Sequence, residues 1–346
     1  MKANLVYFDR WMDPIGPEII NASGSFEMTK LSFKDAPEIN WKAFEKAHAY
    51  QALPSTETEK LFYPRRDMVK RCPDLLAVSV SGAGYDMVDV DACTEAGILV
   101  VNQTGANAES VAQHAIGLML NLSKKINQSD RATLRDGRDW SRWTYTGAEL
   151  TGRTLGIVGL GKIGRRVSEI AKVFSMNVIA YDPYLTNTDF AERGAKSVSL
   201  EELCKSSDFV TVHCPLTDDS ANMIGAKQYN AMKPSAFFIQ TARGGIHDEV
   251  ALENAIANNK IAGAGLDVFM AEPAAHDHPL IGYDNVIATP HNAGITTDCL
   301  FNMGKWSADQ WLDIWAGKRP PRFKNPDVWA KYSERFKAIT GRAVID

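Results

Sequence analysis

Short apolar runs alternate with segments of helical periodicity from about residue 154 onwards. The run TLGIVGL (154–160) is followed at once by glycine and predicts a buried strand, and residues 162–174 place apolar side chains at helical spacing. A further helix is predicted over 248–259. This alternation predicts a parallel sheet with helices on both faces. The other predicted strands of this sheet are NVIAYD, DFVTVHCP, AFFIQTA, IAGAGLDVF and NVIATPH.

The first 100 residues show the same alternation less regularly. LVYF and LLAVSVS are predicted strands, and 41–48 and 63–71 are predicted helices, so this part is expected to form a smaller α/β domain. Residues 107–126 have a long helical period and are expected to form one helix that bridges the two domains. A proline pair opens residues 319–346, which are expected to lie on the surface as a tail.

Composition narrows the class of protein. At about 150 residues per domain, 346 residues predict two domains. The formal charge is 38 − 42 = −4, which provides no basic surface for nucleic acid. The apolar runs are far shorter than the roughly 20 residues of a membrane span, and Asp9 and Arg10 interrupt any signal-peptide core. Five scattered cysteines without a C-x-x-C pair are typical of reduced thiols, so we expect a cytoplasmic protein.

A glycine-rich loop follows the strand at 154–160. Gly159, Gly161 and Gly164 form a G-x-G-x-x-G pattern between a strand and an amphipathic helix, the context that dinucleotide-binding loops require. The first glycine permits the tight turn, the second lets backbone approach a pyrophosphate, and the third lets the helix pack against the strand. The helix N-terminus then presents N–H groups and partial positive charge to the phosphates.

An acidic residue ends the next predicted strand. Asp182 lies 18 residues after Gly164, where a carboxylate can accept hydrogen bonds from both ribose hydroxyls of NAD and would repel a 2′-phosphate. Pro183 and Tyr184 follow it, so no arginine is present there for NADP. The predicted cofactor is therefore NAD.

Three further polar segments each follow a predicted strand: TARGG (241–245), DVFMAEP (267–273) and TPHNAG (289–294). In an open parallel sheet, ligands bind outside the carboxyl ends of the strands, so Arg243, Glu272 and His291 are expected to face the nicotinamide. Taken singly, each of these residues is more typical of a solvated loop than of a site. Together they indicate catalysis.

The chemistry of these three side chains is complementary. A guanidinium binds a carboxylate and an adjacent carbonyl oxygen with paired donors. An imidazole gives or takes one proton near neutral pH, and a carboxylate behind it selects the ring tautomer and stabilises the imidazolium. An arginine, a histidine and a carboxylate beside NAD predict a 2-hydroxy acid dehydrogenase.

The chain resembles the D-isomer-specific 2-hydroxyacid dehydrogenases from about residue 75 to about residue 315. The spacings of the three predicted catalytic residues match the family too, at 272 − 243 = 29 and 291 − 272 = 19 residues. The motifs that carry the resemblance are SGAGYDMVD, NAESVAQHA, GLGKIGRRV, YDPY, HCPLT, TARGG, GLDVFMAEP and TPHNAG.

The resemblance implies an architecture of two Rossmann-like lobes. A doubly wound NAD domain (106–296) would be inserted into a smaller flavodoxin-like substrate domain made of 1–105 and 297–346, and the protein would be a homodimer through the NAD domain. The resemblance also assigns roles: Arg243 would bind substrate carboxylate and carbonyl, His291 would be the acid/base, and Glu272 would tune it. No metal is implied.

The same resemblance assigns binding residues. Backbone N–H groups near Ala83 and Gly84 would hold the substrate carboxylate, and Asp267 would contact the nicotinamide carboxamide. His213, Cys214 and Pro215 would line the adenosine side. The remaining residues expected to contact NAD are Gly159, Gly161, Lys162, Ile163, Gly164, Asp182, Thr241, Ala242, Arg243, His291 and Gly294.

Several alternatives stay open. Phosphite-oxidising relatives carry a lysine where Ala83 stands, and phosphoglycerate-specific relatives place an arginine near 50–56, where this chain has none. Both substrates are therefore disfavoured. Trp140 or Trp143 could reach a partner's active site or simply pack at an interface. A NAD-binding sensor or corepressor of the same fold is the alternative to an enzyme.

Overall fold

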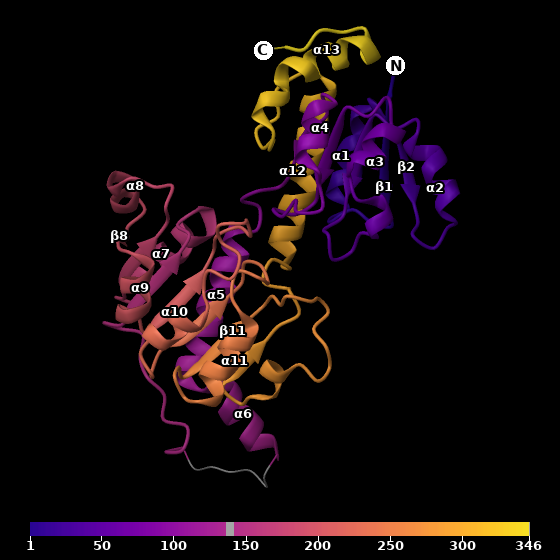
Figure 1. The fold of residues 1–346 in the computed structure, drawn as a ribbon. Coiled ribbons are helices and arrows are strands. Elements are labelled where there is room, and N and C mark those ends of the chain that lie inside the picture. The colour runs from indigo at the N-terminus through magenta and orange to yellow at the C-terminus, as the bar shows by residue number, and fades with distance from the viewer. Residues whose placement is uncertain (136–141, 346) are drawn as a thin grey trace. The chain divides into compact units, whose positions relative to one another are not determined.

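The computed structural model describes residues 1–135 and 142–345, which form two units (Figure 1). Unit 1 comprises residues 1–107 and 295–346, and unit 2 comprises residues 108–294. Each unit has its own parallel sheet and its own buried cores.

In the described part of unit 2, seven parallel strands lie in the order β12-β11-β10-β9-β6-β7-β8. The chain runs outward from β6 in both directions, so the strand order reverses between β6 and β9, where doubly wound folds bind ligands. All six strands predicted for this sheet are present, and only the two-residue edge strand β8 was not predicted. The strands are β6 (Thr154–Val158), β7 (Asn177–Tyr181), β8 (Lys196–Ser197), β9 (Phe209–Val212), β10 (Phe237–Gln240), β11 (Gly263–Leu266) and β12 (Val286–Ala288).

Helices cover both faces of this sheet, as predicted. Leu118 of α5 and Val167 of α7 are buried on one face, and Leu203 of α9 and Leu252 of α11 are buried on the other. The helices of unit 2 are α5 (Ala108–Lys124), α6 (Ile126–Arg135), α7 (Lys162–Val173), α8 (Asn187–Glu192), α9 (Leu200–Ser206), α10 (Ala226–Ala231), α11 (Glu249–Ala257) and the 3-10 helix η2 (Pro279–Gly282).

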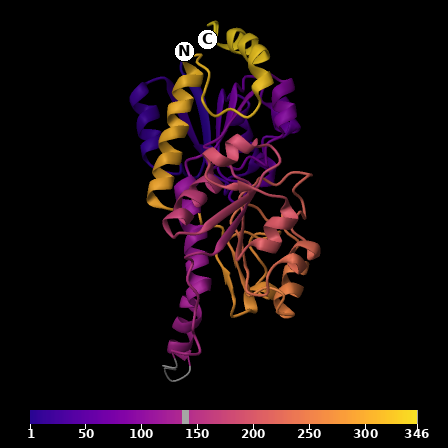
Figure 2. The same cartoon turned by 90° about the vertical axis from the view of Figure 1, so that its left-hand side faces the viewer.

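The helix predicted over 107–126 is present as α5, which ends at Lys124, and a separate helix, α6, follows it from Ile126 (Figure 2). Continuation of α5 would need the Ser123 carbonyl to accept from Asn127 N. That carbonyl instead accepts from Ala148 N at 2.8 Å, and Asn127 N donates to the Asn121 side chain at 2.8 Å. Lys125 between the helices adopts a left-handed φ of 54°. A returning chain segment therefore ends the helix.

Among the described residues of unit 1, five parallel strands lie in the order β2-β1-β3-β4-β5, which is the flavodoxin order. The predicted flavodoxin-like class is thus confirmed. The strands are β1 (Ala3–Phe8), β2 (Phe26–Leu31), β3 (Ala49–Ala52), β4 (Ala77–Val80) and β5 (Leu99–Val101). The helices are α1 (Ile15–Ser23), α2 (Pro37–Phe44), η1 (Lys60–Phe62), α3 (Arg66–Arg71), α4 (Val90–Glu95), α12 (Thr297–Trp315), η3 (Pro326–Val328) and α13 (Trp329–Thr340).

The prediction that residues 319–346 form a tail on the surface is wrong. Residues 329–340 form α13, and Val328, Tyr332 and Phe336 are fully buried against Trp311 and Trp315 of α12. These three residues recur every four positions, which places them on one side of a helix. The proline pair interrupts the chain before the helix and does not prevent it.

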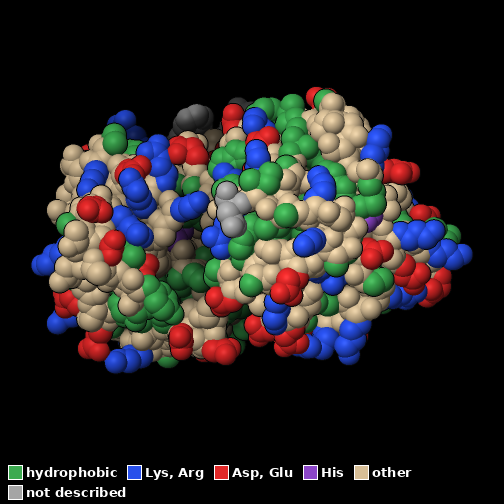
Figure 3. Space-filling model, turned by 90° about the horizontal axis from the view of Figure 1, so that it is seen from above, with side chains coloured by type: hydrophobic (Ala, Val, Ile, Leu, Met, Phe, Trp, Pro, Cys, Tyr) green, Lys and Arg blue, Asp and Glu red, His purple; other side chains and the backbone are tan. Residues whose placement is uncertain are grey.

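The surface carries charges of both signs. Figure 3 shows Lys and Arg side chains interspersed with Asp and Glu on the face drawn, in keeping with the formal charge of −4. Among the described residues, none of the helices combines the length and the apolar character that crossing a bilayer demands.

Candidate active site

The glycine-rich loop turns sharply from β6 into α7. Gly159 has a φ of +88°, and a Cβ there would lie 2.7 Å from Cys214 N. A Cβ at Gly164 would lie 2.1 Å from Gly159 O, so this glycine is needed for helix–strand packing. A Cβ at Gly161 would meet no atom within 4 Å, so this glycine leaves space that a ligand can use. Because α7 begins without a side-chain cap or an acidic residue in its first turn, its N-terminus suits a phosphate.

Asp182 follows β7 and is bound to the same loop. One carboxylate oxygen accepts from Leu160 N at 3.0 Å, and the other accepts from Tyr184 N at 3.1 Å. Arg193, which the sequence did not single out, donates to Leu160 O at 2.8 Å. The N–H and the carbonyl of Leu160 are therefore both hydrogen-bonded to side chains, and the Asp182 carboxylate lies directly beside the glycine-rich loop.

Two buried polar atoms follow the central strands β9 and β10 without a hydrogen-bond partner among the described residues: His213 Nδ1 and Thr241 Oγ1. They are neighbours in the sheet, because Val212 pairs with Gln240. The ring of His213 also contacts Thr211 Oγ1 at 2.9 Å, and burial lowers its pKa to about 3, so the ring is neutral at physiological pH. Unpartnered buried polar atoms and an open glycine loop fit a dinucleotide at this edge.

Cys214 and Pro215 complete the loop after β9. Burial, more than any other effect, raises the pKa of the Cys214 thiol to about 11, so the sulfur stays protonated and unreactive. Its backbone N lies against Gly159, which brings the β9 loop and the glycine-rich loop together.

Arg243 lies in a loop after β10 whose glycines allow a close approach. A Cβ at Gly244 would lie 2.0 Å from Phe269 O, and Gly245 has a φ of +83°. The Arg243 guanidinium donates to its neighbour Ala242 O at 2.7 Å. The R-G-G sequence therefore brings the arginine against the 267–272 loop.

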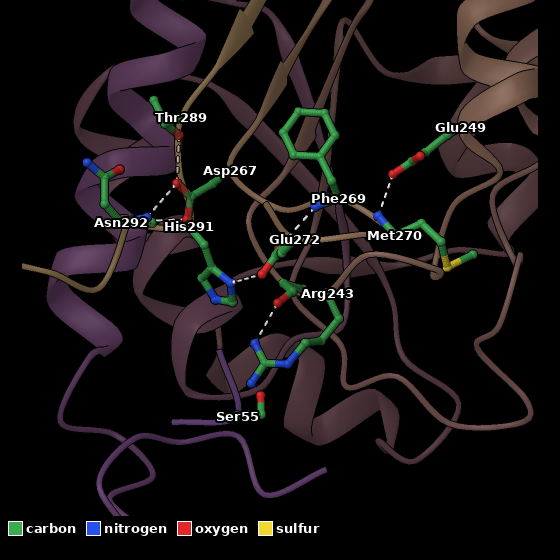
Figure 4. A network of polar contacts seen from close by, with 12 residues as sticks. Ser55, Arg243, Glu249, Asp267, Phe269, Met270, Glu272, Thr289, His291 and Asn292 are labelled. Atoms are coloured by element: carbon green, nitrogen blue, oxygen red, sulfur yellow. Dashed lines mark hydrogen bonds and ion pairs between the residues drawn. The ribbon is translucent and has the colours of Figure 1, made fainter. Parts of the chain in front are cut away.

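Glu272 and His291 form a hydrogen-bonded pair, with 2.7 Å between Glu272 Oε2 and His291 Nδ1 (Figure 4). The other Glu272 oxygen accepts from Phe269 N at 3.1 Å. Burial is the largest influence and raises the pKa of Glu272, but the bond and charge of His291, the Phe269 N–H and the charge of Arg243 together outweigh it. The pKa of Glu272 is therefore below its usual value, and the group is a carboxylate at neutral pH.

Asp267 shapes the loop that carries His291. It is 1% exposed, and it accepts from Thr289 Oγ1 at 2.6 Å, Asn292 N at 2.9 Å and Ala293 N at 3.0 Å. Its backbone carbonyl accepts from His291 N at 2.8 Å. His291 itself has a φ of +52°, a strained conformation that such surroundings maintain at functional sites.

Ala83 and Gly84 lie in unit 1, in the loop between β4 and α4. The Gly82 carbonyl accepts from Gln103 N at 2.9 Å, and the Ala83 carbonyl accepts from Asn102 Nδ2. Among the described residues, the N–H groups of Ala83 and Gly84 have no acceptor.

Of the two tryptophans considered for a partner's site, Trp140 lies outside the described residues, and Trp143 is 78% exposed.

Sequence reasoning missed three residues that support this site: Arg193, Glu249 and Asn102. Each acts through a backbone group of a loop distant in sequence. Hydrophobic periodicity carries no signal for such contacts. Only Glu249 could have been placed near the strand ends from the sequence, because it lies at the start of a capped helix.

Comparison with known proteins agrees with this geometry. The model of the D-isomer specific 2-hydroxyacid dehydrogenase family, NAD binding domain, matches residues 116–293. The chain therefore belongs to the D-isomer-specific 2-hydroxyacid dehydrogenase family, as its motifs predicted. The match falls within unit 2, which is thus the NAD-binding domain.

Three similar proteins illustrate the range of the family. The D-3-phosphoglycerate dehydrogenase of Archaeoglobus fulgidus is 40% identical over 251 residues, 72% of this chain and 47% of that relative. The glyoxylate reductase of Korarchaeum cryptofilum is 35% identical, over 85% of this chain and 88% of that relative. The crystal structure of a glyoxylate reductase from Paecilomyes thermophila has a TM-score of 0.84 at 27% identity, covering 93% and 98% of the two chains. The chain spans about half the length of the curated D-3-phosphoglycerate dehydrogenases it matches.

Proposed function

We propose that this protein is an NAD-dependent dehydrogenase that interconverts a D-2-hydroxy acid and its 2-keto acid. The observation that carries the proposal is the Glu272–His291 pair at 2.7 Å, at the carboxyl edge of the NAD-domain sheet and close to Arg243. A carboxylate that orients an imidazole beside a cation is suited to moving one proton at an oxygen next to a carboxylate.

His291 is the proposed acid/base. Because Nδ1–H donates to Glu272, Nε2 is the nitrogen that exchanges a proton with the substrate oxygen. When Nε2 is protonated for reduction, the adjacent carboxylate stabilises the imidazolium, and this carboxylate is ionised because its pKa is lowered. After proton transfer the neutral ring keeps its hydrogen bond to Glu272 and its orientation.

Arg243 is proposed to bind the substrate. Its guanidinium presents paired donors to the carboxylate and to the C2 oxygen, and its charge stabilises negative charge that develops on that oxygen. When NAD is bound, its nicotinamide takes up or supplies the hydride at C2. The Ala83 and Gly84 N–H groups of unit 1 have no acceptor among the described residues and are suited to a carboxylate, so we propose that they also contact the substrate.

The residues that we assign to NAD binding lie in the loops after strands β6, β7, β9, β10, β11 and β12. Gly161 gives room for the pyrophosphate, Lys162, Ile163 and Gly164 form the first turn of α7, and Asp182 accepts from the ribose. The other proposed contacts are those of Gly159, His213, Cys214, Pro215, Thr241, Ala242, Asp267 and Gly294.

We propose a small unphosphorylated 2-keto acid as the substrate. Residues 50–56 contain no arginine to bind a phosphate, and the Korarchaeum relative is a glyoxylate reductase. The Archaeoglobus relative is a D-3-phosphoglycerate dehydrogenase, so the phosphorylated acid belongs in the same test.

The test is a panel of glyoxylate, hydroxypyruvate, longer 2-keto acids, 3-phosphoglycerate and phosphite, with NAD(H) and NADP(H) alongside. Turnover of unphosphorylated 2-keto acids with NADH is expected, and His291→Ala should lose about 100-fold or more in kcat. Wild-type turnover by His291→Ala would contradict the acid/base role, and an NADPH preference would contradict the role of Asp182. Tight NADH binding without any turnover would show a sensor instead of an enzyme.

We also propose a homodimer through the NAD domain. Ile126 and Leu134 of α6, together with Trp143, are 54%, 77% and 78% exposed, and a second copy would cover such apolar side chains. Light scattering should give twice the chain mass for the wild type and a smaller mass for Leu134→Glu. A wild-type monomer would contradict the proposal.

A further inference from the structure

We propose that Glu249 is a positioning residue for the acid/base pair, acting through the backbone of the 267–272 loop. This inference rests on the proposed function of Glu272 and His291. Glu249 lies outside the residues expected to contact substrate or cofactor, yet it is bonded to the loop from which Glu272 reaches His291 (Figure 4).

The start of α11 places Glu249 at this loop. Asp248 caps the helix by accepting from Ala251 N at 3.0 Å, which puts Glu249 at its first position. From there Glu249 Oε1 accepts from Met270 N at 2.6 Å, and Oε2 lies 3.2 Å from His278 Nε2. The Glu249 and His278 side chains are each 17% exposed, so water competes little for these bonds.

Two carboxylates therefore hold consecutive N–H groups of one loop. Glu272 accepts from Phe269 N at 3.1 Å, and Glu249 accepts from the next N–H along the chain, that of Met270. Glu272 is itself part of this loop, so its bond to Phe269 cannot anchor the loop to the rest of the domain. Glu249 provides that anchor from helix α11.

The side chains at this point of the loop explain why a backbone anchor is needed. Met270 is 61% exposed and contributes little packing. Phe269 is buried and packs edge-on against the His278 ring, with ring centroids 5.1 Å apart. The Phe269 carbonyl lies so close to Gly244 of the Arg243 loop that a Cβ there would collide with it. A shift of the Met270 peptide would therefore disturb the supports of Glu272 and Arg243 together.

A merely structural bond between α11 and the following segment is the competing explanation, and the same helix offers a matched control. One turn further on, Glu253 accepts from Tyr283 OH at 2.7 Å. This bond also ties α11 to a later segment, but it does not touch the 267–272 loop. Loss of Glu253 removes this bond, and loss of Glu249 removes the bonds to Met270 and His278, so only loss of Glu249 should affect catalysis.

The experiment compares Glu249→Ala, Glu249→Asp, Glu249→Gln and Glu253→Ala with the wild type. Displacement of catalytic groups by about an ångström costs up to about 100-fold in rate, so Glu249→Ala should lower kcat at least about tenfold with little change in the KM for keto acid or NADH. Glutamine keeps an oxygen for the Met270 N–H and should retain most of kcat. Aspartate keeps the charge at the helix N-terminus but withdraws the oxygen, so it should behave like alanine.

Hydrogen exchange of the substrate-free protein gives a readout that needs no turnover. Amides of the 267–272 peptide should exchange faster in Glu249→Ala and Glu249→Asp than in the wild type, Glu249→Gln or Glu253→Ala. If Glu249→Ala does not fold, Glu249→Asp carries the test. Unchanged exchange in 267–272, or an equal fall in kcat for Glu253→Ala, would overturn the inference. A wild type without turnover would overturn the proposed function, while the exchange result would still judge the anchoring role.

Discussion

At the residue scale, burial and hydrogen bonding act in opposite directions on the Glu272 carboxyl group. Removal from water favours the protonated form, whereas His291, the Phe269 N–H and Arg243 favour the carboxylate and prevail. A half-buried carboxylate that stays ionised can hold one tautomer of His291 and stabilise its protonated form. The pH at which this support is lost follows from the lowered pKa.

Glu272→Gln should lower kcat by about 100-fold, because the amide oxygen still accepts from Nδ1 but carries no charge to stabilise the imidazolium. In the wild type, kcat should persist as the pH falls until it passes through the lowered pKa of Glu272, and then decline. The variant has no carboxyl proton to gain, so this part of its pH profile should be absent. The measurement is kcat against pH with saturating NADH. Glu253→Gln is the matched control, and a Glu272→Gln profile identical to the wild type would contradict the assignment.

At the element scale, the loops between strands and helices decide the chemistry, and their glycines serve different purposes. Gly164 is needed by the protein, since a Cβ there would collide with Gly159 O. Gly161 has open space around its missing Cβ and an ordinary φ of −73°, so the fold itself does not require a glycine there. The same motif therefore contains one glycine that packing requires and one that only the proposed pyrophosphate contact would require.

Gly161→Ala and Gly164→Ala should separate these purposes. Gly161→Ala is expected to leave the thermal unfolding temperature unchanged and to weaken NADH binding, because the added methyl occupies the space of the pyrophosphate. Gly164→Ala is expected to lower the unfolding temperature of the NADH-free protein. Calorimetry and fluorescence titration with NADH check both results. Equal destabilisation by the two variants would show that Gly161 also has a packing role.

The elements themselves differ in how well the sequence predicted them. The NAD-domain strands are short apolar runs, and all six predicted runs are strands. In unit 1, β2, β3 and β5 escaped prediction. Edge strand β2 is buried mainly at its two ends, and β5 has only three residues. Strand β3 contains the polar residue Gln51, whose side-chain amide is hydrogen-bonded to Ser81 and Trp311. In β3, a polar residue that finds its partners only in the folded unit hides the strand pattern.

At the scale of the whole molecule, each unit contains its own buried cores, so damage to one need not abolish the other. The helix α13 near the C-terminus belongs to the core of unit 1. Its contribution comes from burying large aromatic side chains against α12, which a surface tail would not do.

Phe336→Ala should reduce the free energy of unfolding of unit 1 by about 3 to 5 kcal/mol, the usual result of removing a fully buried phenylalanine ring. NADH affinity should change little, since unit 2 holds the cofactor residues. Urea unfolding followed by NADH titration of the native variant measures both effects. Lys337→Ala, at an exposed position of the same helix, is the control and should change the free energy of unfolding little. A change for Phe336→Ala as small as that of the control would contradict the described packing.

The sequence by itself determined the α/β class, the glycine-rich loop and three catalytic candidates, because strand runs and motif spacings are local properties of the chain. The tertiary structure alone decided that Glu272 and His291 meet at 2.7 Å, that Asp267 and Glu249 hold the loops behind them, and that α13 is part of a core. Those contacts join segments far apart in the chain. Hydrogen bonding and packing between such segments depend on the paths of loops, which hydrophobic periodicity does not encode.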